Sequence, residues 1–230
     1  MTGSRGNPNL RPFEALQADA TLEWYFAPAS SLTGAVFYKK VDSFTVTTVT
    51  REFVPGFSER FGLFDISQPQ NGEDGTIQGF ELAYQHAFRF LPAPFDNLGV
   101  QLNYTYVDSK TPLVDSITGE RLPLPGLSRD SYTLIGYYED GTFSLRAAYT
   151  YRSKYLNSVG GAASGGNTYV DGRGQLDASA QINLTPNVRL TVEGINLTKA
   201  IDRQYLGEPD RLTFTAREDR RIFFGIAANF

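Results

Sequence analysis

Apolar and polar residues alternate strictly along most of this chain. Between Leu16 and Phe26 every second residue is apolar, and the residues between them are Gln17, Asp19, Thr21, Glu23 and Tyr25. Side chains of a β-strand point alternately to its two faces, so this pattern predicts a strand with one apolar and one polar face. The same alternation returns around residues 98–106, 143–152, 175–182 and 222–230. We therefore expect an all-β protein without a helical segment.

The alternation predicts about nine long strands. They cover residues 15–27, 31–50, 75–90, 97–109, 129–139, 142–156, 168–184, 187–198 and 213–230. In the second strand the apolar parity shifts near Lys39 and Lys40, which predicts a β-bulge. Short connections rich in Pro, Gly, Asn and Asp alternate with long ones, the long ones near residues 51–74, 110–128, 157–167 and 199–212. Short turns at one end and long loops at the other indicate an antiparallel up-and-down meander, the arrangement of outer-membrane β-barrels.

The distribution of aromatic and charged residues favours a membrane barrel over a soluble sandwich. The chain has 13 Tyr and 17 Phe, and many of them lie near the ends of the predicted strands, as in the aromatic girdles of membrane barrels. The opposite parity carries charges of both signs, which are costly in a dry core but tolerated in a wetted lumen. A soluble carbohydrate-binding sandwich is the alternative, and it predicts a chain that stays monodisperse without detergent.

Composition also excludes several classes of function. The chain has no Cys and a single His, His86, which rules out disulfide scaffolds, thiolate metal sites and multi-histidine metal sites. A formal net charge of −4 argues against a nucleic-acid partner bound through a basic surface. The sequence suggests neither an enzyme nor a cofactor. It has no run of 18 apolar residues and no apolar stretch at its start, so we expect neither a transmembrane helix nor a signal peptide on this chain.

Several segments in sequence order resemble the C-terminal β-barrel portion of TonB-dependent outer-membrane receptors. They are Gly6-Asn-Pro-Asn-Leu-Arg-Pro-Phe-Glu14, Gln78-Gly-Phe-Glu-Leu-Ala-Tyr84, Leu124-Pro-Gly-Leu-Ser128, Arg146-Ala-Ala-Tyr-Thr-Tyr-Arg152 and Gly194-Ile-Asn-Leu-Thr198. In the first of them Phe13 is interposed before the glutamate, a small departure from the family pattern. The chain ends in Phe230 after alternating apolar residues, which resembles the terminal signature of bacterial outer-membrane proteins.

The resemblance implies a barrel of about 22 strands closed around an N-terminal plug domain. Nine strands counted back from the C-terminus correspond to the last nine, so residues 1–230 are expected to form a single partial barrel domain without the plug. Residues 1–13 then lie on the extracellular side. The implied location is the outer membrane of a Gram-negative bacterium, and the implied parent imports a scarce nutrient such as a siderophore, cobalamin or an oligosaccharide.

The resemblance also implies the partners. They are outer-membrane lipid, the barrel-assembly machinery through the C-terminal strand and Phe230, an unknown small-molecule ligand, and the TonB complex through the missing plug alone.

Two groups of residues are candidates for contact with the ligand. The first is an aromatic set in the first long loop: Phe53, Phe57, Phe61 and Phe64. Such rings stack on sugars or planar chelates, but a loop packed on itself or on a missing neighbour is the favoured alternative. The second is a lumen-facing set of polar residues on the predicted strands: Glu81, Gln101, Asn103, Arg146, Arg152, Gln175, Asp177, Gln181 and Glu193. These line a transport path or, alternatively, contact the plug and one another. His86 is expected at the membrane interface.

A passive porin or structural barrel, complete in itself, is the alternative function. Bacterial single-chain barrels have an even number of strands, so this alternative needs a tenth strand, for which residues 199–215 are the candidate. An unclosed sheet has two edge strands whose backbone groups hydrocarbon does not satisfy. We therefore expect no autonomous transport by the nine strands alone.

Overall fold

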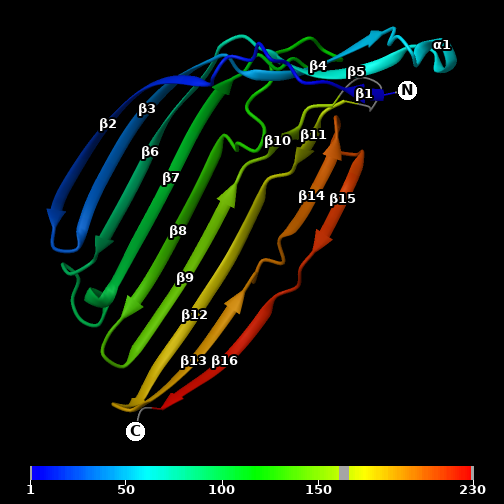
Figure 1. Ribbon diagram of the computed structural model, residues 1–230. Coiled ribbons are helices and arrows are strands. Elements are labelled where there is room, and N and C mark those ends of the chain that lie inside the picture. The colour runs from blue at the N-terminus through cyan, green and yellow to red at the C-terminus, as the bar shows by residue number, and fades with distance from the viewer. Residues whose placement is uncertain (1, 161–165, 229–230) are drawn as a thin grey trace.

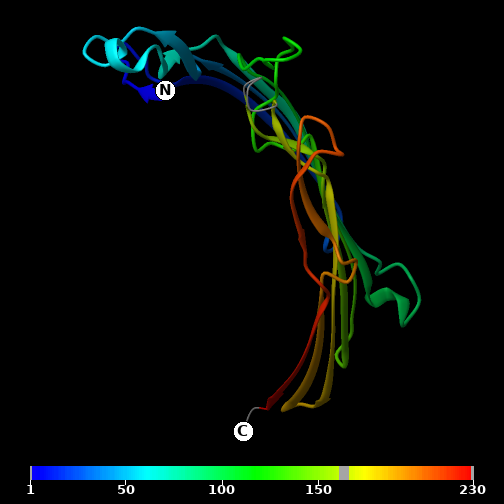
Figure 2. The same ribbon diagram turned by 90° about the vertical axis from the view of Figure 1, so that its right-hand side faces the viewer.

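Nine strands form one curved antiparallel sheet in the computed structural model, which describes residues 2–160 and 166–228. The strands are β2 (Glu14–Ala27), β3 (Ser30–Asp42), β6 (Gly75–Ala87), β7 (Leu98–Lys110), β8 (Asp130–Glu139), β9 (Phe143–Arg152), β12 (Arg173–Thr185), β13 (Val188–Ile195) and β16 (Arg221–Ala228). Each pairs with its neighbours in chain order, from β2 at one edge to β16 at the other (Figure 1). The predicted nine-stranded meander is confirmed. Figure 2 shows the sheet edge-on, curved like a segment of a cylinder wall.

The two ends of the sheet differ as the loop lengths predict. The short connections β2–β3, β6–β7, β8–β9 and β12–β13 lie at one end, together with the end of β16, and the N-terminal segment lies at the other (Figure 1). The β6–β7 connection contains a 3-10 turn, η1 (Phe95–Asn97). We call these two ends the short-turn end and the loop end.

The loop end carries two smaller sheets. One has the order β1-β5-β4 and consists of β1 (Thr2–Ser4), β4 (Thr45–Glu52) and β5 (Phe64–Asn71), with the single-turn helix α1 (Ser58–Phe61) between β4 and β5. The other has the order β10-β11-β14-β15 and consists of β10 (Tyr155–Ser158), β11 (Thr168–Val170), β14 (Ile201–Leu206) and β15 (Leu212–Arg217). The hairpins of the main sheet therefore continue beyond it into ordered extensions. None of the helices in the described residues is long and apolar enough to cross a membrane.

Four expectations from the sequence are wrong. The predicted strands 142–156, 168–184 and 213–230 each divide between the main sheet and the four-stranded sheet, as β9 and β10, β11 and β12, and β15 and β16. The chain does contain short helical turns, α1 and η1. The second predicted strand breaks into β3 and β4 at Ser43, whose φ of 58° turns the chain, and the pairing of β3 runs through Lys39 and Lys40 without the predicted bulge. Residues 199–215 do not supply a tenth strand of the main sheet, because they contain β14 and the first part of β15, and both strands belong to the four-stranded sheet.

The register of the main sheet separates its two faces cleanly. Directly paired residues point to the same face, and one rung across six strands, starting at β2, reads Leu22, Gly34, Leu82, Tyr104, Tyr132 and Tyr151. We call this the apolar face. The opposite face, which we call the polar face, has a rung of Asn103, Thr133, Thr150 and Gln175. Neither face is covered by a second layer, so large apolar residues such as Leu22 remain 76% exposed.

Asp140 closes the β8–β9 connection at the short-turn end. Its carboxylate accepts hydrogen bonds from the Tyr138 hydroxyl at 2.6 Å and from the backbone N–H groups of Thr142 and Phe143, both at 2.7 Å. These donors hold the pKa of the Asp140 carboxyl below its ordinary value, with the tyrosine hydroxyl as the largest cause. The ionised aspartate thus fixes the turn that sets the register of the hairpin.

Candidate functional site

A pocket of about 700 Å³ lies on the polar face near the loop end. Strands β7, β8, β9 and β12 form its floor, and residues 126–128 of the long β7–β8 loop form part of its wall. Its lining combines hydroxyls, amides, two arginines and a carboxylate from the polar face: Asn103, Thr105, Ser128, Ser131, Thr133, Thr150, Arg152, Arg173, Gln175 and Asp177. Tyr132 and Tyr151 also border the pocket, but their side chains have the opposite parity. Such a hollow with converging polar groups is the usual form of a small-molecule site.

A chain of hydrogen bonds along β12 orders one side of the pocket. The Arg173 guanidinium donates to Gln175 Oε1 at 2.8 Å and pairs with Asp202 of β14 at 3.1 Å. The Gln175 amide donates in turn to both carboxylate oxygens of Asp177, at 2.9 and 3.1 Å. Residues 173, 175 and 177 share one face because side chains two positions apart on a strand point the same way. The Arg173 Nε is buried and lacks a hydrogen-bond partner within the described structure.

Arg152 anchors the loop that walls the other side of the pocket. Its Nε donates to the Ser128 hydroxyl at 3.0 Å, and its Nη2 donates to the Gly126 carbonyl at 3.3 Å. The guanidinium also lies 4.0 Å from the centroid of the Tyr155 ring, a cation–π contact. Arg152 therefore joins strand β9, strand β10 and the β7–β8 loop into one rim.

The two long loops beside the pocket are tied together by a buried amide. Asn167 is 2% exposed, its Nδ2 donates to Asp115 Oδ2 at 2.7 Å, and its Oδ1 accepts from the Gly160 N–H at 3.1 Å. The other Asp115 oxygen accepts from the backbone N–H groups of Thr118 and Ile117, which hold the pKa of its carboxyl below the ordinary value. These contacts join the β7–β8 loop to Gly160 and Asn167 at the two ends of the β10–β11 connection.

The four predicted rings lie on residues 53–64, the segment that leads from β4 into β5 at the loop end, which we call the aromatic loop. The Phe57 and Phe64 rings pack edge-on at 6.4 Å, and the Arg60 guanidinium lies 5.1 Å from the Phe61 ring centroid. Phe53, Phe57 and Phe61 are exposed, at 54%, 57% and 46%. Of the four predicted rings, the described structure thus brings one pair together. A ligand-contacting role for this loop stays a prediction.

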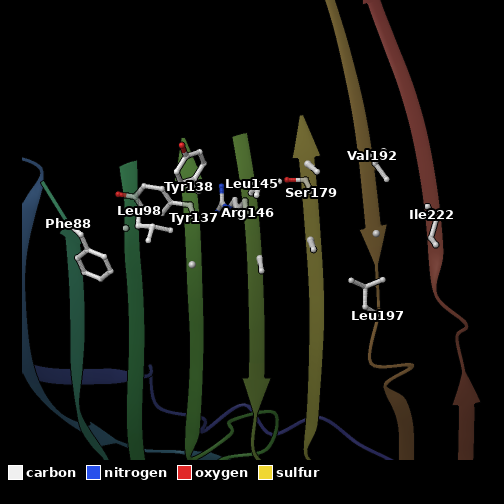
Figure 3. A pocket seen from close by; sticks show the side chains of 16 residues that line it. Phe88, Leu98, Tyr137, Tyr138, Leu145, Arg146, Ser179, Val192, Leu197 and Ile222 are labelled. Atoms are coloured by element: carbon white, nitrogen blue, oxygen red, sulfur yellow. The ribbon is translucent and has the colours of Figure 1, made fainter. Parts of the chain in front are cut away.

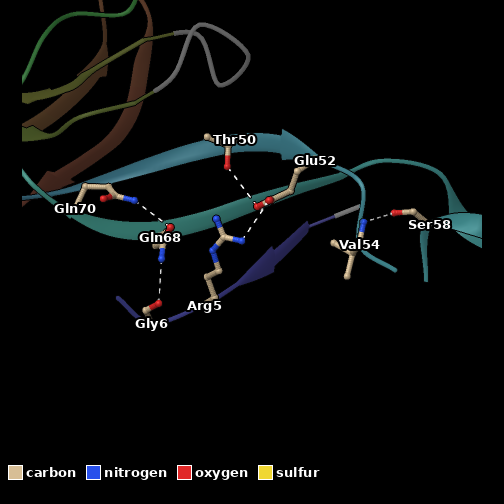
Figure 4. Close-up of polar contacts among 8 residues, drawn as sticks. All are labelled: Arg5, Gly6, Thr50, Glu52, Val54, Ser58, Gln68 and Gln70. Carbon is tan, nitrogen blue, oxygen red and sulfur yellow. Dashed lines mark hydrogen bonds and ion pairs between the residues drawn. The ribbon is translucent and has the colours of Figure 1, made fainter. Parts of the chain in front are cut away.

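The extension is held by the N-terminal segment through polar contacts (Figure 4). Arg5 pairs with Glu52 at 3.2 Å, and the Gln68 amide donates to the Gly6 carbonyl at 3.0 Å. The Ser58 hydroxyl at the start of α1 accepts from the Val54 N–H at 2.8 Å. Strand β1 pairs in parallel with β5 beside these contacts. These polar contacts and the β1–β5 pairing therefore hold the aromatic loop in a defined position.

The predicted lumen-facing residues all share the polar face by register. Asn103, Arg152, Gln175 and Asp177 line the pocket. Gln101 and Arg146 border a smaller hollow of about 320 Å³ nearer the short-turn end, and Glu193 borders another of about 290 Å³ with Arg146 and Asp177. Glu81 and Gln181 line none of these hollows. That this face is a lumen remains a proposal, and Phe230 lies outside the described residues.

Sequence reasoning missed Arg173 and the hydroxyl pair Thr133 and Thr150. Arg173 lies at the first position of β12 with the same parity as Gln175 and Asp177, so the alternation itself was the available signal. The Thr133 and Thr150 hydroxyls lie 3.4 Å apart because their strands pair in register. Which threonines meet depends on that register, which the sequence did not specify. The described residues contain no group of three or more metal-ligating side chains.

A second hollow, of about 670 Å³, lies on the apolar face (Figure 3). A row of small residues crosses its floor in register: Gly136, Ala147, Ala178 and Gly194. Phe88, Leu98, Tyr138, Leu145, Val192 and Ile222 surround it. The Arg146 and Ser179 side chains at its border have the opposite parity. The hollow therefore suits hydrocarbon and offers little to a polar nutrient.

Comparison with protein families identifies the chain. The family model described as "TonB dependent receptor-like, beta-barrel" matches residues 1–197. The chain belongs to this family. Its members are outer-membrane β-barrel receptors, so the resemblance of the strand motifs is confirmed. A search of the curated proteins found no match.

Solved structures agree with this TonB-dependent receptor barrel in fold. A mutant ferric enterobactin receptor, PfeA of Pseudomonas aeruginosa in complex with enterobactin, is 19% identical with a TM-score of 0.67, covering 99% of this chain and 33% of its own. The ferric-catecholate import receptor Fiu of E. coli K12 is 16% identical with a TM-score of 0.64, covering 96% of this chain and 28% of its own. The copper transporter OprC is 17% identical with a TM-score of 0.61, covering 96% of this chain and 33% of its own. The barrel described here thus spans about a third of the length of these receptors.

Proposed function

We propose that this chain forms one wall and part of the outer rim of an outer-membrane receptor that imports a scarce iron chelate. The observation that carries the proposal is the pocket with two arginines on the polar face, next to residues 126–128 of the β7–β8 loop. The rest of the receptor, including a plug domain through which the TonB complex would act, lies outside this chain. In this proposal the last strand and Phe230 engage the barrel-assembly machinery.

The faces of the sheet support the orientation. A charged side chain in hydrocarbon costs about 2–4 kcal/mol near the middle of a membrane barrel. The apolar face carries few charges along the strands, whereas the polar face carries Glu81, Arg146, Asp177 and Glu193. We therefore infer that the apolar face is turned to lipid and the polar face to the barrel interior, so that an imported ligand would pass the pocket.

The chemistry of the pocket supports an anionic, oxygen-rich ligand over a neutral one. Arg152 and Arg173 line the pocket together with hydroxyls from β7, β8 and β9. Guanidinium groups bind carboxylates and other anionic oxygens with charge-assisted hydrogen bonds. The similar structures include a receptor complexed with enterobactin and a ferric-catecholate importer. Among siderophore, cobalamin and oligosaccharide, these observations favour the siderophore.

Binding to outer membranes that contain the complete receptor tests the proposal. The probes are iron-loaded enterobactin, cyanocobalamin and a maltodextrin, each radiolabelled. We expect saturable binding of the iron chelate, weakened tenfold or more by Arg173→Ala, because a hydrogen bond to a charged group contributes about 1.5–3 kcal/mol.

Arg189→Ala is the matched control. Arg189 shares the polar face at the short-turn end, where it donates to Asn183 at 3.2 Å, and its loss should leave binding unchanged. Binding of cyanocobalamin or maltodextrin alone would contradict the proposed ligand class. Ion conductance without saturable binding of any probe would favour the passive porin.

A further inference from the structure

The β6–β7 connection, residues 88–97, differs from the other short connections of the main sheet. It is longer than they are and contains η1, and Figure 2 shows it leaving the sheet on the convex side, away from the hollow of the curve. Its sequence, Phe-Arg-Phe-Leu-Pro-Ala-Pro-Phe-Asp-Asn, holds three phenylalanines and a leucine in ten residues. We call this segment the foot.

The outer rings of the foot are exposed although they are fully apolar. Phe90 is 71% exposed and Phe95 is 56% exposed. A pair of phenylalanines on a projecting turn is unfavourable in water, because about 25 cal/mol is gained for each Å² of apolar surface removed from it. Their exposure indicates a surface that is covered in the assembled protein.

The foot is continuous with the apolar face of the sheet. The His86 ring of β6 lies 5.1 Å from Phe26, 5.2 Å from Phe88 and 5.6 Å from Phe90, measured between ring centroids. Phe88 also borders the hollow on that face (Figure 3). The rings thus form one uninterrupted surface from the strands to the foot, on the side that the family's barrel geometry turns to lipid.

The backbone of the foot satisfies many of its own hydrogen bonds. The Phe88 N–H donates to the Leu98 carbonyl at 2.9 Å, the Leu91 N–H to Phe88 at 3.0 Å and the Phe95 N–H to Pro92 at 2.9 Å. The Asn97 N–H also donates to the Pro94 carbonyl at 3.3 Å. Three backbone N–H groups, those of Leu91, Phe95 and Asn97, therefore donate to carbonyls within the foot itself. Backbone groups that are already paired enter an apolar layer at little cost.

We propose that the foot lies in the interfacial layer of the membrane leaflet on the short-turn side, with Phe90 and Phe95 among phospholipid acyl chains. Arg89 and Asp96 keep it at the interface and out of the hydrocarbon centre, and the exposed Arg89 side chain reaches lipid headgroups. The occupant of this surface is therefore phospholipid. The proposal depends on the membrane-spanning barrel and not on the identity of the imported ligand.

Spin labels at single cysteines test the proposal in the complete receptor reconstituted in phosphatidylethanolamine–phosphatidylglycerol vesicles. The 230 residues contain no Cys, so Phe90→Cys and Phe95→Cys each introduce a unique site in this chain. Oxygen concentrates in the bilayer and a nickel chelate stays in water, so the ratio of their relaxation effects reports depth. Gly141→Cys is the control, because it lies in the β8–β9 connection at the same end and an added Cβ there meets nothing within 4 Å.

We expect labels at positions 90 and 95 to be at least several-fold more accessible to oxygen than to the nickel chelate, and the label at 141 to show the opposite. Water-like ratios at 90 and 95 would overturn the proposal. Low accessibility to both reagents would overturn it as well, since the foot would then be covered by protein and not by lipid.

Discussion

Two neighbouring alanines on β9 offer the sharpest test of the two-faced sheet. Ala147 lies on the apolar face between Gly136 and Ala178, and Ala148 lies on the polar face between Ile135 and Asp177. The same substitution, Ala→Arg, therefore places one guanidinium in lipid and the other beside a carboxylate. The two variants have the same composition and the same net charge, so any difference between them arises from the face.

The expected difference follows from the depth of the strand. β9 has ten residues, which rise about 33 Å along the strand and about 25 Å along the membrane normal at a tilt of about 40°. Ala147 is the fifth of them and so lies near the midplane of the apolar band. Arginine there costs about 2–4 kcal/mol. At 1.4 kcal/mol for each tenfold change, Ala147→Arg lowers the ratio of folded to unfolded barrel by roughly 30- to 700-fold.

The assay is urea unfolding of the complete receptor in lipid vesicles, followed by the heat-modifiable shift of the folded barrel in gel electrophoresis. We expect Ala147→Arg to lower the unfolding midpoint strongly and Ala148→Arg to stay close to the unmodified protein. Equal losses from the two substitutions, or a loss confined to Ala148→Arg, would refute the assignment of the faces.

Three further outcomes are expected in the complete receptor. Asn167→Ala should raise amide hydrogen exchange in the β10–β11 loop at least tenfold, because it removes the hydrogen bond to the Asp115 carboxylate. The control Asn187→Ala, in the β12–β13 turn, should leave this exchange unchanged. Unchanged exchange in Asn167→Ala would contradict the proposed link between the two loops. Gly79→Ala should lower stability by about 1–3 kcal/mol in urea unfolding, because its Cβ collides with the Tyr106 carbonyl, whereas Gly34→Ala meets open space and should be neutral. The folded pKa of Asp140 is lowered, so its contribution is present above the unfolded pKa and disappears as pH falls through the folded value. The difference in unfolding midpoint between the unmodified protein and Asp140→Asn should therefore shrink on acidification, and a constant difference would speak against this role.

The main sheet could be predicted because its physics is local. A strand with lipid on one face and water on the other must alternate, so parity alone located all nine strands. What parity cannot detect is a change of direction between two alternating segments. β3 and β4 were joined because the run Thr45–Thr50 keeps strand composition, while the break depends on a single positive φ at Ser43.

The pocket could be predicted only in part for a related reason. Parity placed Asn103, Arg152 and Asp177 on one face, and the structure brings them around one hollow. The partners from the loops, such as Ser128, and from the smaller sheet, such as Asp202, depend on how the long connections fold back. No periodic pattern in the sequence encodes those contacts.

The most direct test of the account is a fluorescence scan along β8 in the complete receptor. Single cysteines from Ser131 to Tyr138, labelled with bimane, are exposed to vesicles with brominated acyl chains. We predict strong quenching at the even positions, such as Leu134, and weak quenching at the odd positions, such as Thr133, since these belong to opposite faces of the sheet. Uniform quenching, or quenching at the odd positions alone, would contradict a barrel wall with its polar face turned inward.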